Sequence, residues 1–179
     1  QTEYGYRFIT GSHVLYMKPL TETKYDISCS RYQWNHTWKP YFDWNRNYKS
    51  IREALPESDP CLYKAASYSS GIRILRQDLW EMMITFLISQ QKTIPKIREA
   101  VEALAKKYGA KRTAALSDGS IRTYYSFPSP EELASASLDD LLTLKLGYRA
   151  KYIHRLIQDV LAGTVSLESL AALPPDEAM

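Results

Sequence analysis

Apolar residues recur at helical spacing in the second half of the chain, and this pattern constrains the fold more than any other feature. Between Asp78 and Gln91 they stand three or four positions apart, as on one face of an α-helix. Asp78 itself is a residue type that caps helix N-termini. The spacing returns in Ile94–Tyr108, which Gly109 follows as a stop signal. Both segments are therefore predicted to be helices with a buried face.

Further helix signals continue toward the C-terminus. Ser129 and Ser137 each begin a capping-box pattern, with an acid three residues later, and each precedes a Leu-rich segment. A last amphipathic helix is predicted over 150–161. Pro174-Pro175, followed by acids, is typical of one more helix N-terminus. We therefore expect the second region to be helical throughout and to continue past Met179.

The first thirty residues follow another pattern. From Tyr4 to Ser30, short β-prone runs alternate loosely between turn residues, which predicts an antiparallel meander with a hairpin at Gly11. Residues 34–48 are aromatic and interrupted, and we interpret them as a connector with a short helix. The expected fold class is α+β, with an N-terminal β domain over 1–57 and a helical domain over 58–179.

Composition excludes several classes of protein. Two cysteines without a CxxC pair, and three scattered histidines, indicate neither a disulfide scaffold nor a metal site. No apolar run approaches the roughly 18 residues of a membrane span, and no signal peptide is evident. No close pair of acids suggests glycosidase-type hydrolysis. We expect a soluble, intracellular protein, and its formal charge of +3 fits an anionic partner.

Five consecutive polar residues, Ser89 to Thr93, lie where the first two predicted helices meet. The amide of Gln91 donates and accepts hydrogen bonds together, which suits the edge of an unpaired base, and Lys92 suits a phosphate. Thr93 completes this turn. The alternative is an ordinary polar turn between helices.

A second turn gathers a glycine, an aromatic ring and cations before the last predicted helix. Gly147 permits close approach of the backbone, Tyr148 offers a ring for stacking or wedging, and Arg149 offers donors to base edges. Lys151 adds positive charge. The alternative is a helix-capping glycine followed by a solvated basic turn.

Several motifs, in this order, resemble the 8-oxoguanine DNA glycosylase family, especially its bacterial members. They read YFDWNRNY over 41–48, GIRILRQD over 71–78, FLIS over 86–89, YSFP over 125–128 and LGYRAKY over 146–152. The family joins a TATA-binding-protein-like antiparallel β domain to an all-helical domain with a helix-hairpin-helix element. The resemblance implies that 1–57 are part of the first domain and that 58–179 are the second, incomplete at its C-terminus.

The resemblance also implies roles in DNA binding. Gln91, Lys92 and Thr93 match the turn that enters DNA from the minor groove and fills the space left by the flipped base. Tyr148 matches the aromatic wedge that buckles the neighbouring pair, and Arg149 matches the residue that contacts the estranged cytosine. The DNA-binding set is completed by Gly147 and Lys151.

In this family the catalytic residues are separate from the DNA-binding turns. The damaged nucleotide rotates out of the stack, a lysine amine attacks C1′ of its sugar, an aspartate assists, and a Schiff base permits β-elimination without metal or organic cofactor. Both residues match positions beyond Met179, so we expect no catalytic residue in this chain and no activity from it alone. The implied partner is double-stranded DNA containing an oxidised purine. It would be bound by a monomer in the bacterial cytoplasm, associated with the nucleoid, or in a eukaryotic nucleus.

Two other functions stay open. The family usually has Asn where Gln91 stands, and Ser89-Gln90-Gln91 is nearer to the alkylated-base glycosylases of the same superfamily. A stand-alone module that recognises distorted duplexes without catalysis is a different class, and it predicts salt-dependent DNA binding.

Overall fold

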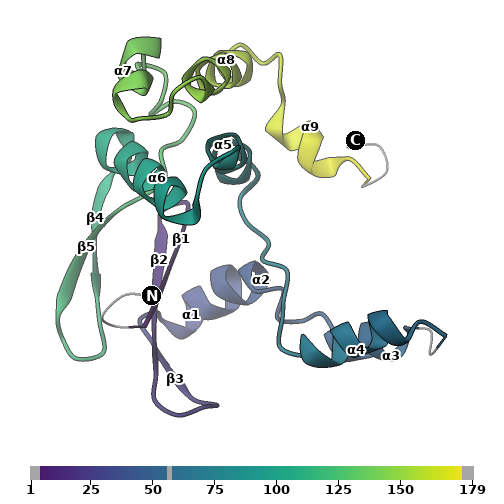
Figure 1. Cartoon of the computed structure of the whole chain (residues 1–179). Coiled ribbons are helices and arrows are strands. Elements are labelled where there is room, and N and C mark those ends of the chain that lie inside the picture. The colour runs from purple at the N-terminus through teal and green to yellow at the C-terminus, as the bar shows by residue number, and fades with distance from the viewer. Residues whose placement is uncertain (1–4, 56–57, 175–179) are drawn as a thin grey trace. The chain divides into compact units, whose positions relative to one another are not determined.

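The computed structural model describes residues 5–55 and 58–174, and it confirms the α+β class (Figure 1). Antiparallel strands come first and most of the helices follow. In chain order the elements are β1 Tyr6–Thr10, β2 His13–Pro19, β3 Tyr25–Ile27, α1 Arg31–Gln33, the π-helix η1 Trp34–Trp38, α2 Lys39–Tyr41, α3 Tyr48–Glu53, α4 Pro60–Tyr68, α5 Leu79–Ser89, α6 Ile94–Tyr108, β4 Lys111–Ala115, β5 Ile121–Tyr125, α7 Leu138–Thr143, α8 Arg149–Leu161 and α9 Leu167–Ala172.

The chain forms two compact units. Among the described residues, the first combines 5–28 with 78–174, and the second comprises 29–55 and 58–77. The division into domains 1–57 and 58–179 stays a prediction, because compact units and evolutionary domains need not share boundaries. None of the helices in the described ranges is long and apolar enough to cross a membrane.

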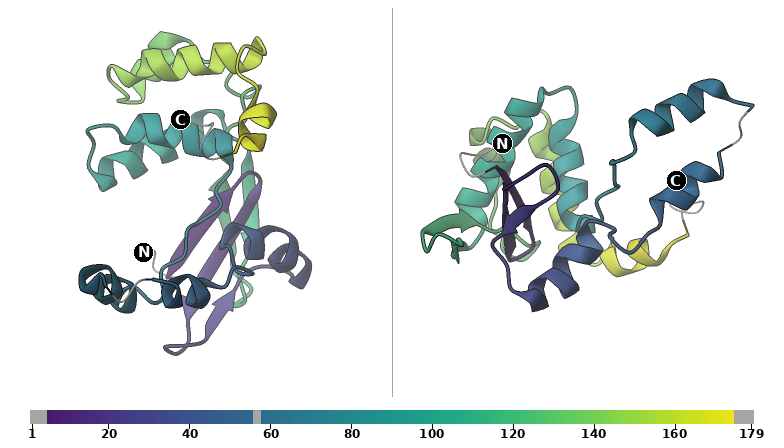
Figure 2. Two further views of the ribbon diagram at one scale, coloured as in Figure 1. Left: turned by 90° about the vertical axis from the view of Figure 1, so that its right-hand side faces the viewer. Right: turned by 90° about the horizontal axis from the view of Figure 1, so that it is seen from below.

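The predicted antiparallel meander is present in the first unit. β1 pairs with β2 and β2 with β3, each antiparallel, and the three strands lie side by side in Figure 2. Gly11 forms the turn between β1 and β2 with φ +49°, a conformation that favours glycine. The hairpin predicted at Gly11 is therefore confirmed. Its turn is held to α5, because the N–H of Gly11 donates to the carboxylate of Glu81 at 2.7 Å.

The expectation of helices throughout 58–179 needs one correction, because β4 and β5 form an antiparallel hairpin. β4 reads KRTAA and is mostly exposed, so no apolar alternation marks it as a strand. The hairpin gains its stability from tertiary contacts. Tyr124 of β5 packs against Val14 and Tyr16 of β2, and its hydroxyl donates to the carbonyl oxygen of Ser12 at 2.8 Å.

The main core lies among the helices of the first unit. Asp78 caps α5 by accepting from the N–H of Glu81 at 3.0 Å, and α6 ends at Gly109, both as predicted. The indole N–H of Trp80 donates to the carbonyl oxygen of Pro128 at 2.9 Å. The core cluster is made of buried apolar side chains from α5, α6, α7, α8 and the segments between them: Trp80, Ile84, Ile88, Ala100, Leu104, Leu133, Ala136, Leu141, Leu146, Ala150, Ile153 and Ile157.

The predicted helix starts have three different outcomes. Ser137 caps α7 as predicted. Ser129 and Glu132 exchange the hydrogen bonds of a capping box, at 2.9 and 3.2 Å, but hydrogen-bonded turns follow instead of an α-helix. Ser137 begins the next helix eight residues after Ser129. The helix start predicted at Pro174-Pro175 lies outside the described residues from Pro175 onward.

The second unit begins with the connector. The residues from Arg31 to Tyr41 run through α1, η1 and α2 without a break, so the predicted short helix is present. Trp38 is fully buried and meets Tyr41 edge to face, with ring centroids 5.5 Å apart. Two helices follow this connector: α3, which the sequence analysis did not predict, and α4, which lies in the range expected to be helical but had no predicted bounds.

Candidate nucleic-acid interface

Two polar turns of the first unit, far apart in sequence, are joined by hydrogen bonds. One turn links α5 to α6 and the other links α7 to α8. The guanidinium of Arg149 donates through Nε to the carbonyl oxygen of Gln90 at 2.8 Å, and through Nη2 to the same oxygen. The ammonium of Lys92 donates to the carbonyl oxygen of Lys145 at 2.9 Å. The helical core thus holds both turns at one place on its surface.

The joined turns contain backbone conformations that most residues avoid. Gln91 has φ +49° and Lys145 has φ +57°, and Gly147 has φ +60°. A side chain at such an angle carries strain, which persists only where the surroundings enforce it. Here the carbonyls of Gln90 and Lys145 are each tied to the opposite turn. The shape of this surface therefore depends on contacts between the turns.

An aromatic surface stands beside the second turn. Tyr148 is 51% exposed, and the guanidinium of Arg149 lies 4.4 Å from the centroid of its ring. Tyr152 meets Tyr148 edge to face, with centroids 6.5 Å apart, and the ammonium of Lys151 lies 4.9 Å from the ring of Tyr152. Exposed rings flanked by cations suit the stacked faces and the phosphates of a nucleic acid.

Arg149 is only 7% exposed, and its donors are partly used within the protein. Nε, Nη2 and, more weakly, Nη1 donate to backbone carbonyls, the last to Leu146 at 3.4 Å. A guanidinium has five N–H groups, so one remains on each terminal nitrogen. Arg149 can therefore hold the turns together and still present donors at the surface.

A groove of about 570 Å³ runs along the first turn and is rich in lysine. Burial, followed by the nearby charge of Arg149, lowers the pKa of Lys92. Lys96 and Lys145 both donate to Glu99, at 2.8 and 3.2 Å, and these hydrogen bonds lower the pKa of its carboxyl. Three lysines thus face one glutamate, which leaves the groove attractive to an anion.

The structure brings most of the predicted DNA-binding residues together. Gln91, Lys92 and Thr93 line the groove, and Gly147 and Tyr148 lie on the turn joined to it. The sequence analysis did not include Lys96 and Glu99. Their position on the exposed face of α6 was the only pattern that could have indicated them. The backbone carbonyls of both turns were also not included, since no side-chain pattern exists for them.

No metal centre is formed by the side chains in the described ranges. Within residues 5–55 and 58–174, no three His, Cys, Asp or Glu side chains lie close enough to share an ion. Cys29 is half-buried, Cys61 is exposed, and both are free thiols.

The strand meander and the helices that carry the two joined turns match two known protein families. Residues 84–177 match the family described as "HhH-GPD superfamily base excision DNA repair protein". Residues 2–83 match the family described as "8-oxoguanine DNA glycosylase, N-terminal domain". The chain belongs to the HhH-GPD superfamily and, within it, to the 8-oxoguanine DNA glycosylase family.

Individual relatives agree with this assignment. The N-glycosylase/DNA lyase of Saccharomyces cerevisiae is 42% identical over 84 residues, which cover 46% of this chain and 21% of the relative. N-glycosylase/DNA lyase OGG1 of Arabidopsis thaliana is 32% identical over 99 residues, which cover 54% of this chain and 25% of the relative.

Solved structures match nearly the whole chain. The Clostridium acetobutylicum 8-oxoguanine glycosylase/lyase, in complex with double-stranded DNA containing cytosine opposite 8-oxoG, is 30% identical with a TM-score of 0.84, over 97% of this chain and 58% of that one. MBOgg1 in complex with a low-affinity DNA ligand is 34% identical with a TM-score of 0.85, over 99% and 60%. The 3-methyladenine DNA glycosylase of Archaeoglobus fulgidus, at 15% identity and TM-score 0.67, shares the fold. The chain thus spans about three fifths of these structures.

Proposed function

We propose that this chain is the DNA-gripping part of an 8-oxoguanine DNA glycosylase that flips the damaged base out of the duplex, excises it and cleaves the abasic strand. One observation carries the proposal: Arg149 and Lys92 join the two candidate DNA-binding turns into a single basic surface. The likeness to a glycosylase/lyase solved with lesion-containing DNA supports it. The substrate is double-stranded DNA containing an oxidised purine, bound by a monomer in the bacterial nucleoid or the eukaryotic nucleus.

Each turn has its own part in this proposal. Gln91, Lys92 and Thr93 enter the duplex and occupy the space that the flipped base leaves. Tyr148 wedges against the neighbouring base pair, and its exposure suits stacking. Arg149 offers its remaining N–H groups to the estranged cytosine. Gly147 lets the backbone approach a phosphate, and Lys151 supplies countercharge.

We assign the nucleophilic lysine and the assisting aspartate to residues outside this chain. Lys145 and Lys151 lie on the DNA-binding side and are not nucleophiles in this scheme. Lys92 has a lowered pKa, but its ammonium is held by the carbonyl of Lys145. We expect this chain alone to bind DNA weakly and to excise nothing.

The test compares the complete gene product with this chain on three duplexes, which carry 8-oxoguanine opposite cytosine, an alkylated purine, or no lesion. Excision of 8-oxoguanine with strand cleavage by the complete product is the expected result. Excision of the alkylated base alone would instead identify an alkylated-base glycosylase. Gln91 favours this alternative, because it stands where the 8-oxoguanine family usually has Asn. Salt-dependent binding without excision of either base would identify a non-catalytic module.

A further inference from the structure

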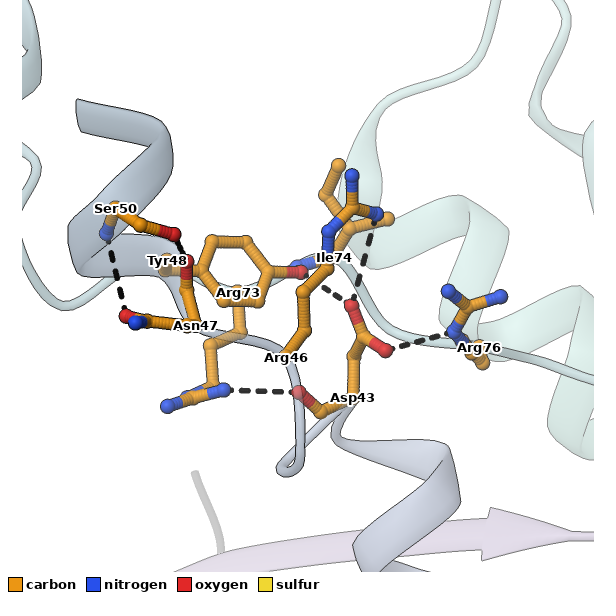
Figure 3. Close-up of polar contacts among 8 residues, drawn as sticks. All are labelled: Asp43, Arg46, Asn47, Tyr48, Ser50, Arg73, Ile74 and Arg76. Atoms are coloured by element: carbon orange, nitrogen blue, oxygen red, sulfur yellow. Dashed lines mark hydrogen bonds and ion pairs between the residues drawn. The ribbon is translucent and has the colours of Figure 1, made fainter. Parts of the chain in front are cut away.

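The loop that follows α2 in the second unit is organised around one carboxylate. Asp43 accepts from the hydroxyl of Tyr48 at 2.9 Å and from Nε of Arg76 at 2.8 Å, as Figure 3 shows. The hydrogen bond from Arg76 is the main cause that lowers the pKa of Asp43. The side chain of Asp43 is only 11% exposed, and its φ is +48°. These contacts tie the loop to the segment that precedes α5.

A second arginine of that segment is held in place beside the carboxylate. Nη1 of Arg73 donates to the carbonyl oxygen of Asp43 at 2.9 Å. Its guanidinium lies 5.2 Å from the ring centroid of Trp44 and 5.0 Å from that of Tyr48. The hydroxyl of Tyr48 in turn accepts from the N–H of Ile74 at 3.0 Å. The guanidinium of Arg73 is therefore held in a fixed orientation by the backbone of Asp43 and by two aromatic rings.

A cavity of about 240 Å³ lies next to this network, entirely within the second unit. Arg52, which contributes to its wall, is anchored by a hydrogen bond to the carbonyl oxygen of Ser70 at 3.0 Å. The cavity has four cations and no acid in its lining, which consists of Arg46, Asn47, Tyr48, Lys49, Arg52, Ser70, Gly71, Ile72 and Arg73.

Nearby acids do not balance this charge. The carboxylate of Asp43 is bonded to Arg76 and approaches Arg46 only to 3.9 Å. Glu53 lies 3.5 Å from Lys49 in an exposed pair, which contributes little. Like charges gathered in a small hollow repel one another, and a bound anion relieves that repulsion. Guanidinium groups match the oxygens of phosphate in particular.

We propose that this cavity binds a phosphate group, with Arg46, Lys49, Arg52 and Arg73 as its countercharges. The cavity is below the roughly 300 Å³ at which pockets for drug-sized ligands begin, which suits a small anion. The phosphate is either free or part of a nucleic-acid backbone. The proposal is independent of the DNA-binding turns, because every lining residue belongs to the second unit.

The test is calorimetric titration of the full chain with pyrophosphate at constant ionic strength. A double variant, Arg46→Gln with Arg52→Gln, is expected to weaken binding at least about tenfold, because it removes two of the four countercharges and each is worth about threefold. Lys64→Gln is the matched control, because it removes one exposed charge from α4 without touching the cavity. It is expected to change affinity less than about twofold.

Two further measurements cover a folding failure of the variant and the source of the phosphate. Should the double variant fail to fold, as judged by circular dichroism, Lys49→Gln replaces it, with an expected loss of about threefold. A short undamaged duplex is then added as competitor. Displacement of pyrophosphate identifies the backbone phosphate as the natural ligand, and retention identifies a free phosphate; both uphold the proposal. An absence of pyrophosphate binding, or equal affinities in the cavity variants and the control, overturns it.

Discussion

The guanidinium of Arg149 donates two hydrogen bonds to the backbone carbonyl oxygen of Gln90, so one side chain of α8 fastens the turn that ends α5. Since Gln91, the next residue, has φ +49°, this contact also supports a strained backbone. The candidate interface therefore depends on a tertiary contact. Mutation of Arg149 is expected to disrupt it.

Arg149→Ala is expected to lower the free energy of unfolding by about 1–3 kcal/mol, because the carbonyl of Gln90 loses its donor in a partly buried site. It is also expected to weaken duplex binding. Urea denaturation and fluorescence anisotropy measure the two effects. Arg155→Ala is the control on the same helix, since Arg155 forms an exposed pair with Asp159, and its expected change is below about 0.5 kcal/mol. Equal stability of the two variants would contradict the prediction.

Tyr148→Ala is expected to weaken binding to a duplex with an abasic site by about 1–3 kcal/mol, through the loss of base stacking. Its effect on stability is expected to be small, because the ring is half-exposed. Tyr148→Phe retains the ring and should retain most of the affinity. Tyr68→Ala, at a ring that is 94% exposed in the other unit, controls for the loss of a surface aromatic. If Tyr148→Ala left the affinity unchanged, Tyr148 would not act as the proposed wedge.

Glu81 makes the stability of the first unit depend on pH. Burial raises the pKa of its carboxyl to about 7, although the N–H of Gly11 opposes the shift. The folded state thus holds a proton that the unfolded chain releases near pH 4.5. The free energy of unfolding is expected to fall as pH rises from about 4.5 to about 7, and to level off above.

Glu81→Gln removes this titration while keeping an acceptor for Gly11. The variant is expected to be more stable than the wild type at pH 8 by about 1–2 kcal/mol, a value reduced for partial solvent screening, and the difference should vanish below about pH 4.5. Urea unfolding across this pH range measures it. Parallel profiles for the two proteins would show that Glu81 does not carry the effect.

Gly109→Ala is expected to destabilise the protein by about 1–3 kcal/mol or more. A Cβ at this position would lie 1.9 Å from the carbonyl oxygen of Ser126 and 2.7 Å from that of Ala105, so the backbone must move. Gly71→Ala is the matched control, because nothing lies within 4 Å of its Cβ, and its expected change is below about 1 kcal/mol in either direction. Thermal unfolding compares them, and similar losses in both variants would refute the steric argument.

Local patterns in the sequence predicted the elements that local chemistry controls. Asp78 caps α5, Gly109 ends α6, Gly11 forms the first hairpin turn, and the spacing over 150–161 lies within α8. Each of these depends on residues within a few positions of one another, which is the range over which capping and periodicity act. The order of the motifs was also sufficient to indicate the family.

Other features depend on residues distant in sequence. The β4–β5 hairpin has an exposed, unpatterned strand and relies on Tyr124 meeting β2. The Ser129 capping box forms, yet no helix follows it. The cavity beside Asp43 gathers cations from α3 itself and from the segments before α3 and after α4. Arg149 and Gln90 meet through a backbone carbonyl, which every residue possesses and no pattern marks. The sequence by itself thus determined helices α5, α6, α7 and α8, the first hairpin and the family. The tertiary structure alone decided which turns meet and which charges gather. Packing and hydrogen bonding between distant segments select among conformations to which the local sequence gives similar free energies.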